Sequence, residues 1–246
     1  MDKVGSYEFM AEPFHCDFSQ RLFMGHLGNH MLNAADFHST DRGFGMHYLN
    51  TINRTWVLSR LAIEMNEMPS QYTRFFVETW VENALRFFTQ RNFRVVGDDD
   101  HVYGYGRSVW AMIDTESRQP ADLLSIHDGA LLQWIENEKP CPIDKGGRVR
   151  MDKDAQLVRT INTFYNDVDI NGHINSVKYI EHVLDLWPID WHRQHAIQRF
   201  EIAYVAEAHG GDRLSFWQQS TADNEYCVRV TKDDEVEVCR SKVIFR

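Results

Sequence analysis

Residues 165–184 read YNDVDINGHINSVKYIEHVL, and the latter part of this stretch predicts the element around which the chain folds. Apolar residues recur there at spacings of three and four, which places them on one face of a helix. They are Ile174, Val177, Ile180, Leu184 and Trp187. Pro188 is expected to end this helix. The stretch therefore predicts a polar loop followed directly by a helix with an apolar face.

After this helix the hydrophobic pattern changes to strict alternation. Residues 200–206 alternate in the manner of a strand. Turn signals at 210–211, 223–224 and 233–234 separate the strand-like stretches that follow. A helix followed by several short strands predicts an antiparallel sheet that curls around the helix.

The first part of the chain repeats this order. A helix is predicted from the same apolar rhythm, which is carried by Leu27, Met31, Ala35 and His38. Strands are predicted at 76–81, 87–96 and 102–113. Prolines and glycines then interrupt any periodicity. We therefore expect a first unit over residues 1–136, a linker over 137–154 and a second unit over 155–246.

Composition narrows the class of protein. The 246 residues are 43% apolar and 25% charged, which is typical of a globular protein. The net charge of 26 − 36 = −10 argues against a nucleic-acid partner. The sequence contains neither an apolar run long enough to span a membrane nor the apolar core of a secretory signal. Four scattered cysteines are typical of reduced thiols, so we expect a cytoplasmic protein.

The loop before the second helix concentrates residues that can carry chemistry. Asp169, Asn171 and His173 alternate, so in an extended segment they would point to one side. The helix that follows offers free N–H groups, which suit an oxygen that acquires negative charge. The alternative is that these are ordinary turn and helix-capping residues.

A resemblance to a known family extends this reading. The pattern DxNGHxNxxxY over 169–179 resembles the active-site segment of hotdog-fold thioesterases. The segments WVLSR (56–60), ETW (78–80), RNF (91–93) and SVW (108–110) resemble the N-terminal half of acyl-acyl carrier protein (acyl-ACP) thioesterases. The resemblance runs from about Phe14 to Phe245. It implies an α+β double hotdog, with two antiparallel sheets each wrapped around a long helix in tandem.

The resemblance also implies an activity and its residues. The expected reaction is hydrolysis of fatty acyl-ACP, which releases a free fatty acid in fatty acid biosynthesis. The implied catalytic residues are Asp169, Asn171, His173 and Glu207. Either Glu207 or His173 would be the base, Asn171 would position the water or the carbonyl, and Asp169 would hold its neighbours. Plant members have a Cys after this Glu, where this chain has Ala208, and usually a Gln between the Asn and the His, where it has Gly172, so bacterial members are the closer likeness.

Two further surfaces are expected. Family likeness places the acyl chain in the first unit, where the candidate lining residues are Met24, Leu27, Met31, Trp56 and Leu61, although each also fits an ordinary core. Docking of the acidic carrier by an acidic protein requires a local basic patch. The candidates are Lys145, Arg148, Arg150, Lys153 and Arg159, although a solvated linker would look the same.

No cofactor, metal or membrane partner is expected, and a monomer and a homodimer remain open. His26 and His30 have helical spacing, but we expect both on the helix surface. The competing functions are an acyl-CoA thioesterase on the same fold, a hotdog dehydratase and a non-catalytic lipid-binding module. Chain-length preference depends on the depth of the slot, which the sequence leaves open.

Overall fold

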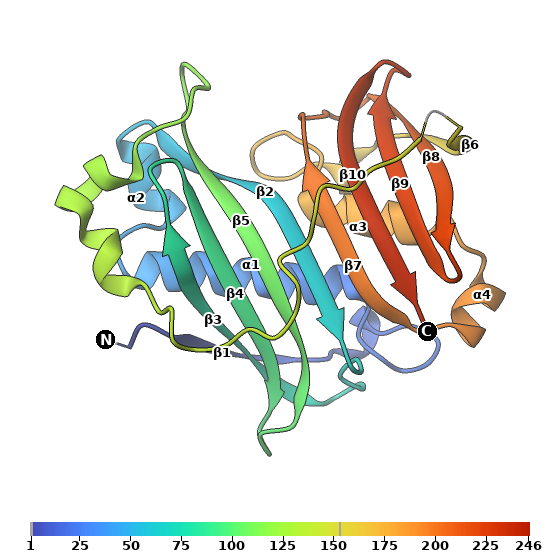
Figure 1. Ribbon diagram of the computed structural model, residues 1–246, viewed down its shortest axis with the longest axis horizontal. Coiled ribbons are helices and arrows are strands. Elements are labelled where there is room, and N and C mark those ends of the chain that lie inside the picture. Colours follow the sequence, from blue (N-terminus) through green and yellow to red (C-terminus); the bar gives the residue numbers. More distant parts are fainter. Residues whose placement is uncertain (1, 153) are drawn as a thin grey trace. The chain divides into compact units, whose positions relative to one another are not determined.

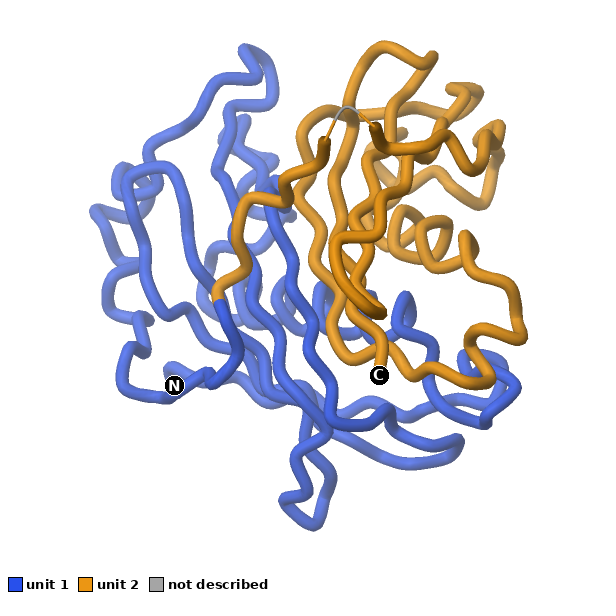
Figure 2. The backbone as a smooth tube through the Cα atoms, turned by 45° about the vertical axis from the view of Figure 1, so that its right-hand side comes forward, with its two compact units in different colours: residues 1–144 blue, residues 145–246 orange. Residues whose placement is uncertain are grey.

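The computed structural model describes residues 2–152 and 154–246, which form two compact units. Unit 1 ends at Asp144 and unit 2 runs from Lys145 to Arg246 (Figure 2). Among the described residues of the predicted linker there is no helix and no strand. Within the described part of the chain, no helix has both the length and the apolar character that a membrane span requires.

Unit 1 is an antiparallel sheet with one long helix against it (Figure 1). The sheet has the order β1 (Gly5–Met10), β3 (Arg74–Ala84), β4 (Phe88–Gly97), β5 (Val102–Asp114) and β2 (Arg54–Met65). The helix is α1 (Met24–Asp41), and it contacts β1 and β3. Its buried face carries Leu27, Met31, Ala35 and His38, so the predicted helix is confirmed.

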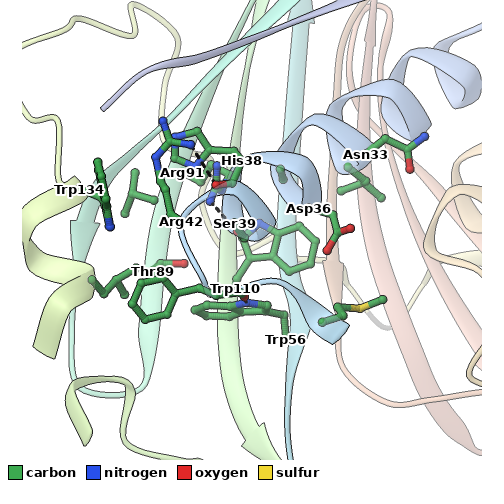
Figure 3. A pocket seen from close by; sticks show the side chains of 16 residues that line it. Asn33, Asp36, His38, Ser39, Arg42, Trp56, Thr89, Arg91, Trp110 and Trp134 are labelled. Carbon is green, nitrogen blue, oxygen red and sulfur yellow. Dashed lines mark hydrogen bonds between the residues drawn. The ribbon is translucent and has the colours of Figure 1, made fainter. Parts of the chain in front are cut away.

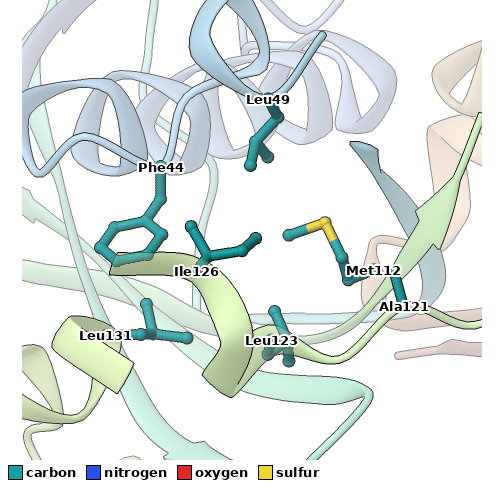
Figure 4. Close-up of a cluster of buried hydrophobic side chains, with 7 residues drawn as sticks. All are labelled: Phe44, Leu49, Met112, Ala121, Leu123, Ile126 and Leu131. Carbon is teal, nitrogen blue, oxygen red and sulfur yellow. The ribbon is translucent and has the colours of Figure 1, made fainter. Parts of the chain in front are cut away.

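Two short helical segments close one end of unit 1. They are α2 (Met46–Thr51) and η2 (Leu123–Trp134), and they bury a cluster of apolar side chains (Figure 4). The cluster contains Phe44, Leu49, Met112, Ala121, Leu123, Ile126 and Leu131. The sequence patterns did not reveal these segments, because α2 is too short to show a period and η2 is kinked at Ile126–Gly129.

Unit 2 repeats the plan of unit 1. Its antiparallel sheet has the order β7 (Ile197–Tyr204), β10 (Val236–Phe245), β9 (Glu225–Lys232), β8 (Arg213–Ala222) and β6 (Gln156–Asn162). The helices are α3 (Ser176–Leu184) and α4 (Ile189–Gln194). The ring of Tyr179 on α3 packs 6.0 Å from that of Tyr204 on β7. Each unit thus places a sheet around a helix, which confirms the predicted double hotdog.

The second helix is shorter than predicted. Asn175 is its N-cap and accepts a hydrogen bond from the Val177 N–H, so Ile174 lies before the helix. Asp185 is the C-cap, so Trp187 lies beyond the end. The residue before a proline is disfavoured in helical conformation, which explains why the chain leaves the helix ahead of Pro188. Ile174 and Trp187 are buried nonetheless, which is why their spacing imitates a longer helix.

Candidate active site

The loop before α3 is a tight turn rather than an extended segment. The N–H of Asp169 donates to the His173 carbonyl at 2.8 Å, and the N–H of Gly172 donates to the Asp169 carbonyl at 3.0 Å. Asp169 Oδ1 accepts from the backbone N–H groups of Asn171 (2.8 Å) and His173 (3.2 Å). The expectation of an extended segment is therefore wrong, because an Asp carboxylate that bonds to nearby amides favours a turn.

Glycine is required at one point of this turn. Gly172 has a φ of +80°, a conformation that other residues adopt at a cost. No heavy atom lies near the position that its Cβ would take, so backbone conformation rather than crowding favours glycine here. The Gly-His sequence thus fits the turn that carries the imidazole.

The turn brings an imidazole and a carboxylate together. The N–H of Ile174 donates to the Ala208 carbonyl at 2.8 Å, and His173 and His209 form an antiparallel bridge. As a result His173 Nε2 lies 3.4 Å from Glu207 Oε2. The two side chains are 27% and 38% exposed, so water can reach both of them. The structure therefore brings together two site residues that the sequence places on separate elements.

The other two predicted site residues lie on the turn itself. The carboxylate of Asp169 bonds to backbone N–H groups, which fixes the position of His173 through the main chain. Asn171 is exposed in the turn. At the start of α3, the N–H groups of Val177 and Lys178 already donate to Asn175. These two amides are therefore engaged within the chain.

Two residues without a predicted role, His209 and Lys232, also contact the His173–Glu207 pair. The ring of His209 lies 5.1 Å from that of His173 in an edge-on arrangement. Lys232 Nζ donates to the Glu207 carbonyl at 2.9 Å, which ties the end of β9 to the site. His209 follows Glu207 by two residues, and this spacing was a usable signal. No pattern in the sequence around Lys232 indicates that it lies at this site, because only the pairing of strands in the sheet brings it close to Glu207.

A largely buried hydrogen bond links the loop to α3. Asp167 is 7% exposed, and its Oδ1 lies 2.8 Å from His182 Nε2 on α3. Its Oδ2 accepts from the Phe164 N–H at 2.7 Å. Asp167 thus connects the loop to the helix and fixes their relative position. The sequence analysis placed neither residue in the site.

Unit 1 contains the same turn without the imidazole. Asp17 Oδ1 accepts from the N–H groups of Ser19 (2.8 Å) and Arg21 (3.4 Å), and the Asp17 N–H donates to the Arg21 carbonyl at 2.8 Å. Gln20, in the place of Gly172, also has a positive φ of 62°. Arg21 Nη1 lies 3.4 Å from Glu67 Oε2. In the sequence the two turns are the five-residue segments DFSQR (17–21) and DINGH (169–173), each of which begins with Asp.

The cavity of unit 1 only partly matches the predicted acyl slot. It has a volume of about 230 Å³, and of the five predicted lining residues it includes Trp56 (Figure 3). The other four are at most 3% exposed and do not line this cavity: Met24, Leu27, Met31 and Leu61. The lining comes instead from the C-terminal half of α1, the segment that follows it, strands β2–β5 and η2.

The residues of the predicted basic patch differ in exposure. Lys145, Arg148 and Arg150 are exposed. Arg159 is half-buried, and its Nη1 donates to the Asp185 carbonyl at 3.0 Å. Lys153 lies outside the described residues. The exposed cations therefore lie at the beginning of unit 2.

The histidines on α1 differ from the expectation. The His30 ring packs against Phe9 at 4.5 Å and Phe75 at 5.7 Å between centroids, and burial lowers its pKa to about 4. It is therefore not a surface residue, whereas His26 stacks on His15 at 4.0 Å.

In residues 2–152 and 154–246 no group of three or more His, Cys, Asp or Glu side chains is arranged to hold a metal.

The fold and the turn define the class: a tandem hotdog protein with a half-buried imidazole–carboxylate pair in its second unit. Residues 4–126 match the acyl-ACP thioesterase N-terminal domain, and residues 151–246 match the acyl-ACP thioesterase C-terminal domain. The chain belongs to the acyl-ACP thioesterase family.

Solved structures agree with this membership. An acyl-ACP thioesterase from Bacteroides thetaiotaomicron is 54% identical, with a TM-score of 0.93 over 99% of this chain and 98% of that one. The 12:0-ACP thioesterase from Umbellularia californica shares the fold, with a TM-score of 0.85 at 19% identity over 100% and 98% of the two chains.

Curated relatives are more distant and longer. The chloroplastic palmitoyl-acyl carrier protein thioesterase of Gossypium hirsutum is 22% identical over 99% of this chain and 64% of its own length. The oleoyl-acyl carrier protein thioesterase of Coriandrum sativum is 24% identical over 82% and 56%. The chain thus spans less than two thirds of the length of these two relatives.

Proposed function

We propose that this chain hydrolyses the thioester of fatty acyl-ACP and releases the free fatty acid for fatty acid biosynthesis. The observation that carries the proposal is the 3.4 Å approach of His173 Nε2 to Glu207 Oε2 on a surface that water reaches. Family membership supports the substrate class. A thiolate is a good leaving group, so a positioned base and a donor for the oxyanion suffice for hydrolysis.

In the proposed mechanism, His173 and Glu207 act together on one water molecule. The imidazole removes a proton as the water oxygen attacks the thioester carbonyl carbon, and the adjacent carboxylate stabilises the imidazolium that forms. When the carbon–sulfur bond breaks, the proton returns to the departing thiolate of the carrier. A positioned general base contributes roughly 10²–10⁴-fold to the rate. Histidine is the side chain that most often acts as a general base in enzymes.

The amide of Asn171 is the proposed donor to the oxyanion. The sequence analysis assigned the donors to the start of the helix, but the Val177 and Lys178 N–H groups already bond to Asn175. Asn171 is exposed beside His173, and its side-chain amide supplies N–H donors. Asp169 is a positioning residue, because it holds the main chain of both neighbours.

We propose that the acidic carrier protein docks against Lys145, Arg148 and Arg150, which are exposed cations on a chain of net charge −10. The acyl chain would occupy unit 1. Four free cysteines support a cytoplasmic location.

The test is release of free fatty acid by the purified protein from acyl-ACPs of increasing chain length and from the matched acyl-CoAs. A higher kcat/KM on acyl-ACP is expected. A higher value on acyl-CoA would assign the protein to the acyl-CoA thioesterases instead, and an enoyl product would show a dehydratase. Binding of acyl-ACP without any release of acid would leave only the lipid-binding function.

A further inference from the structure

A buried arginine stands at one end of the unit 1 cavity. Arg91 on β4 lines the cavity and is only 5% exposed. Its Nη1 donates to Thr79 Oγ1 and its Nη2 to Ser39 Oγ, both at 3.1 Å. Both acceptors are neutral hydroxyls. In the described part of the chain, no carboxylate forms an ion pair with this guanidinium, although a buried charge is normally paired.

A second guanidinium lies at the same end. Arg42 lies over the ring of Trp134, 5.2 Å from its centroid, and donates to the carbonyls of His38 and Asp2. Arg42 Nε and Trp134 Nε1 are both buried, and neither has a hydrogen-bond acceptor among the described residues. Buried donors without acceptors are uncommon in folded proteins, so this end of the cavity lacks an acceptor.

The surrounding groups do not neutralise the two arginines. Burial, and then the proximity of Arg42, lower the pKa of Arg91 to about 9. His38 is neutral, because burial lowers its pKa to about 3. Asp41 accepts from the Tyr7 hydroxyl. Asp36 also lines the cavity and its charge raises the pKa of Arg91, but this effect is smaller than those of burial and Arg42; in Figure 3 Asp36 lies with Asn33 on the other side from Arg91, Arg42 and Trp134.

Most of the remaining lining surface is apolar or aromatic. Trp56, Trp110 and Leu131 line the cavity, so a ligand that fills it would contact mainly hydrocarbon. The last backbone carbonyls of α1 carry partial negative charge. Arg42 donates to one of them, so this partial charge offsets some of the positive charge of Arg42. This effect supplies no acceptor for Arg42 Nε or Trp134 Nε1. A ligand with an apolar chain and an anionic head would complement both parts of the cavity.

We propose that this cavity binds the carboxylate of an aliphatic acid at Arg91 and Arg42, with the chain against Trp56, Trp110 and Leu131. A carboxylate accepts several charge-assisted hydrogen bonds at once, which matches the geometry of guanidinium groups. Such an acid has the chemistry of the product released in the proposed reaction. Its identification as that product rests on the proposed function, whereas the binding site does not.

The test compares two ten-carbon probes, decanoate and decan-1-ol, by calorimetric titration of the whole protein. We expect decanoate to bind at least about 10-fold more tightly, the effect of hydrogen bonds to charged groups. Arg91→Gln and Arg42→Gln should each remove most of this preference. The matched control is Arg74→Gln, because Arg74 lies in the same unit but is 64% exposed and pairs with Glu8, outside the cavity.

Equal affinities for the two probes, no binding of decanoate, or an unchanged preference in both arginine variants would overturn the proposal. If Arg91→Gln fails to fold, the wild-type comparison and Arg42→Gln still decide. His173→Ala should bind decanoate with unchanged affinity, because His173 lies outside this cavity. Binding of decanoate by a wild-type protein that releases no fatty acid would therefore contradict the proposed function and leave the carboxylate site intact.

Discussion

Asp17 in unit 1 and Asp169 in unit 2 occupy the same position in two copies of one turn. Each Oδ1 accepts from the backbone N–H groups two and four residues further on, at 2.8 and 3.4 Å for Asp17 and at 2.8 and 3.2 Å for Asp169. Only the second turn ends in a histidine. Arg21 ends the first, and a guanidinium remains protonated and cannot act as a base. The carboxylate therefore stabilises the turn in both units, whereas the imidazole is present only in the turn of unit 2.

This repeat provides a matched pair of variants. Asp169→Ala and Asp17→Ala should each lower the free energy of unfolding by about 1–3 kcal/mol, since each leaves two backbone amides without their acceptor. Only Asp169→Ala should also lower kcat, by at least about 10-fold, because it displaces His173. Urea unfolding and single-turnover hydrolysis measure the two effects. A similar loss of kcat in Asp17→Ala would show that the effect is not specific to the site.

The His173–Glu207 pair should behave as a unit. His173→Ala and Glu207→Gln should each reduce kcat at least about 100-fold with no change in the thermal midpoint. The double variant should be no slower than about the slower single variant, because groups that act together are not additive. Glu235→Gln, at an exposed position in the turn before β10, is the control. Wild-type turnover in either single variant would rule out the assignment.

The Asp167–His182 pair should matter mainly for stability. His182→Leu leaves one oxygen of a buried carboxylate without its partner and should lower the free energy of unfolding by about 1–3 kcal/mol, measured in urea. Asp167→Asn with His182→Leu should recover part of this loss, because the uncompensated charge is gone. If the single and double variants are equally unstable, the pair does not hold the loop to α3.

Acid stability should depend on His30. Its pKa is about 4 in the folded chain against an ordinary 6.5, so between these pH values the unfolded chain binds more protons. The free energy of unfolding should therefore fall as the pH drops through this window, by up to about 1.4 kcal/mol per pH unit. His30→Met should remove the His30 share of this slope and leave that of buried His38, whereas exposed His47→Met should not change the slope. An unchanged slope in His30→Met would contradict the role of its burial.

The basic patch should affect carrier binding rather than chemistry. Arg148→Glu with Arg150→Glu should raise KM for acyl-ACP and leave kcat nearly unchanged, because both side chains are exposed and distant in sequence from the catalytic turn. KM for a small acyl thioester without a carrier should not change. An unaltered KM for acyl-ACP would remove the patch from the proposal.

Most of the fold could be predicted because its information is local in the chain. The change from helical to alternating periodicity located α1, α3 and most strands, since each pattern reflects one buried face. The length of α3 was wrong because buried residues outside the helix, Ile174 and Trp187, continued its spacing. Four of the five residues predicted for the acyl slot do not line the unit 1 cavity, because apolar residues look the same in sequence whether they face a cavity or a packed core; the slot stays a prediction.

The sequence by itself determined the two-unit plan, the proposed catalytic residues of segment 169–173 and the family they resemble, because these depend on neighbours along the chain. Only the tertiary structure decided that His173 meets Glu207, that Asp17 repeats Asp169 in a turn without an imidazole, and that Arg91 is buried beside a cavity without a carboxylate partner. These relationships depend on strand register and side-chain packing between distant segments, which no local pattern encodes.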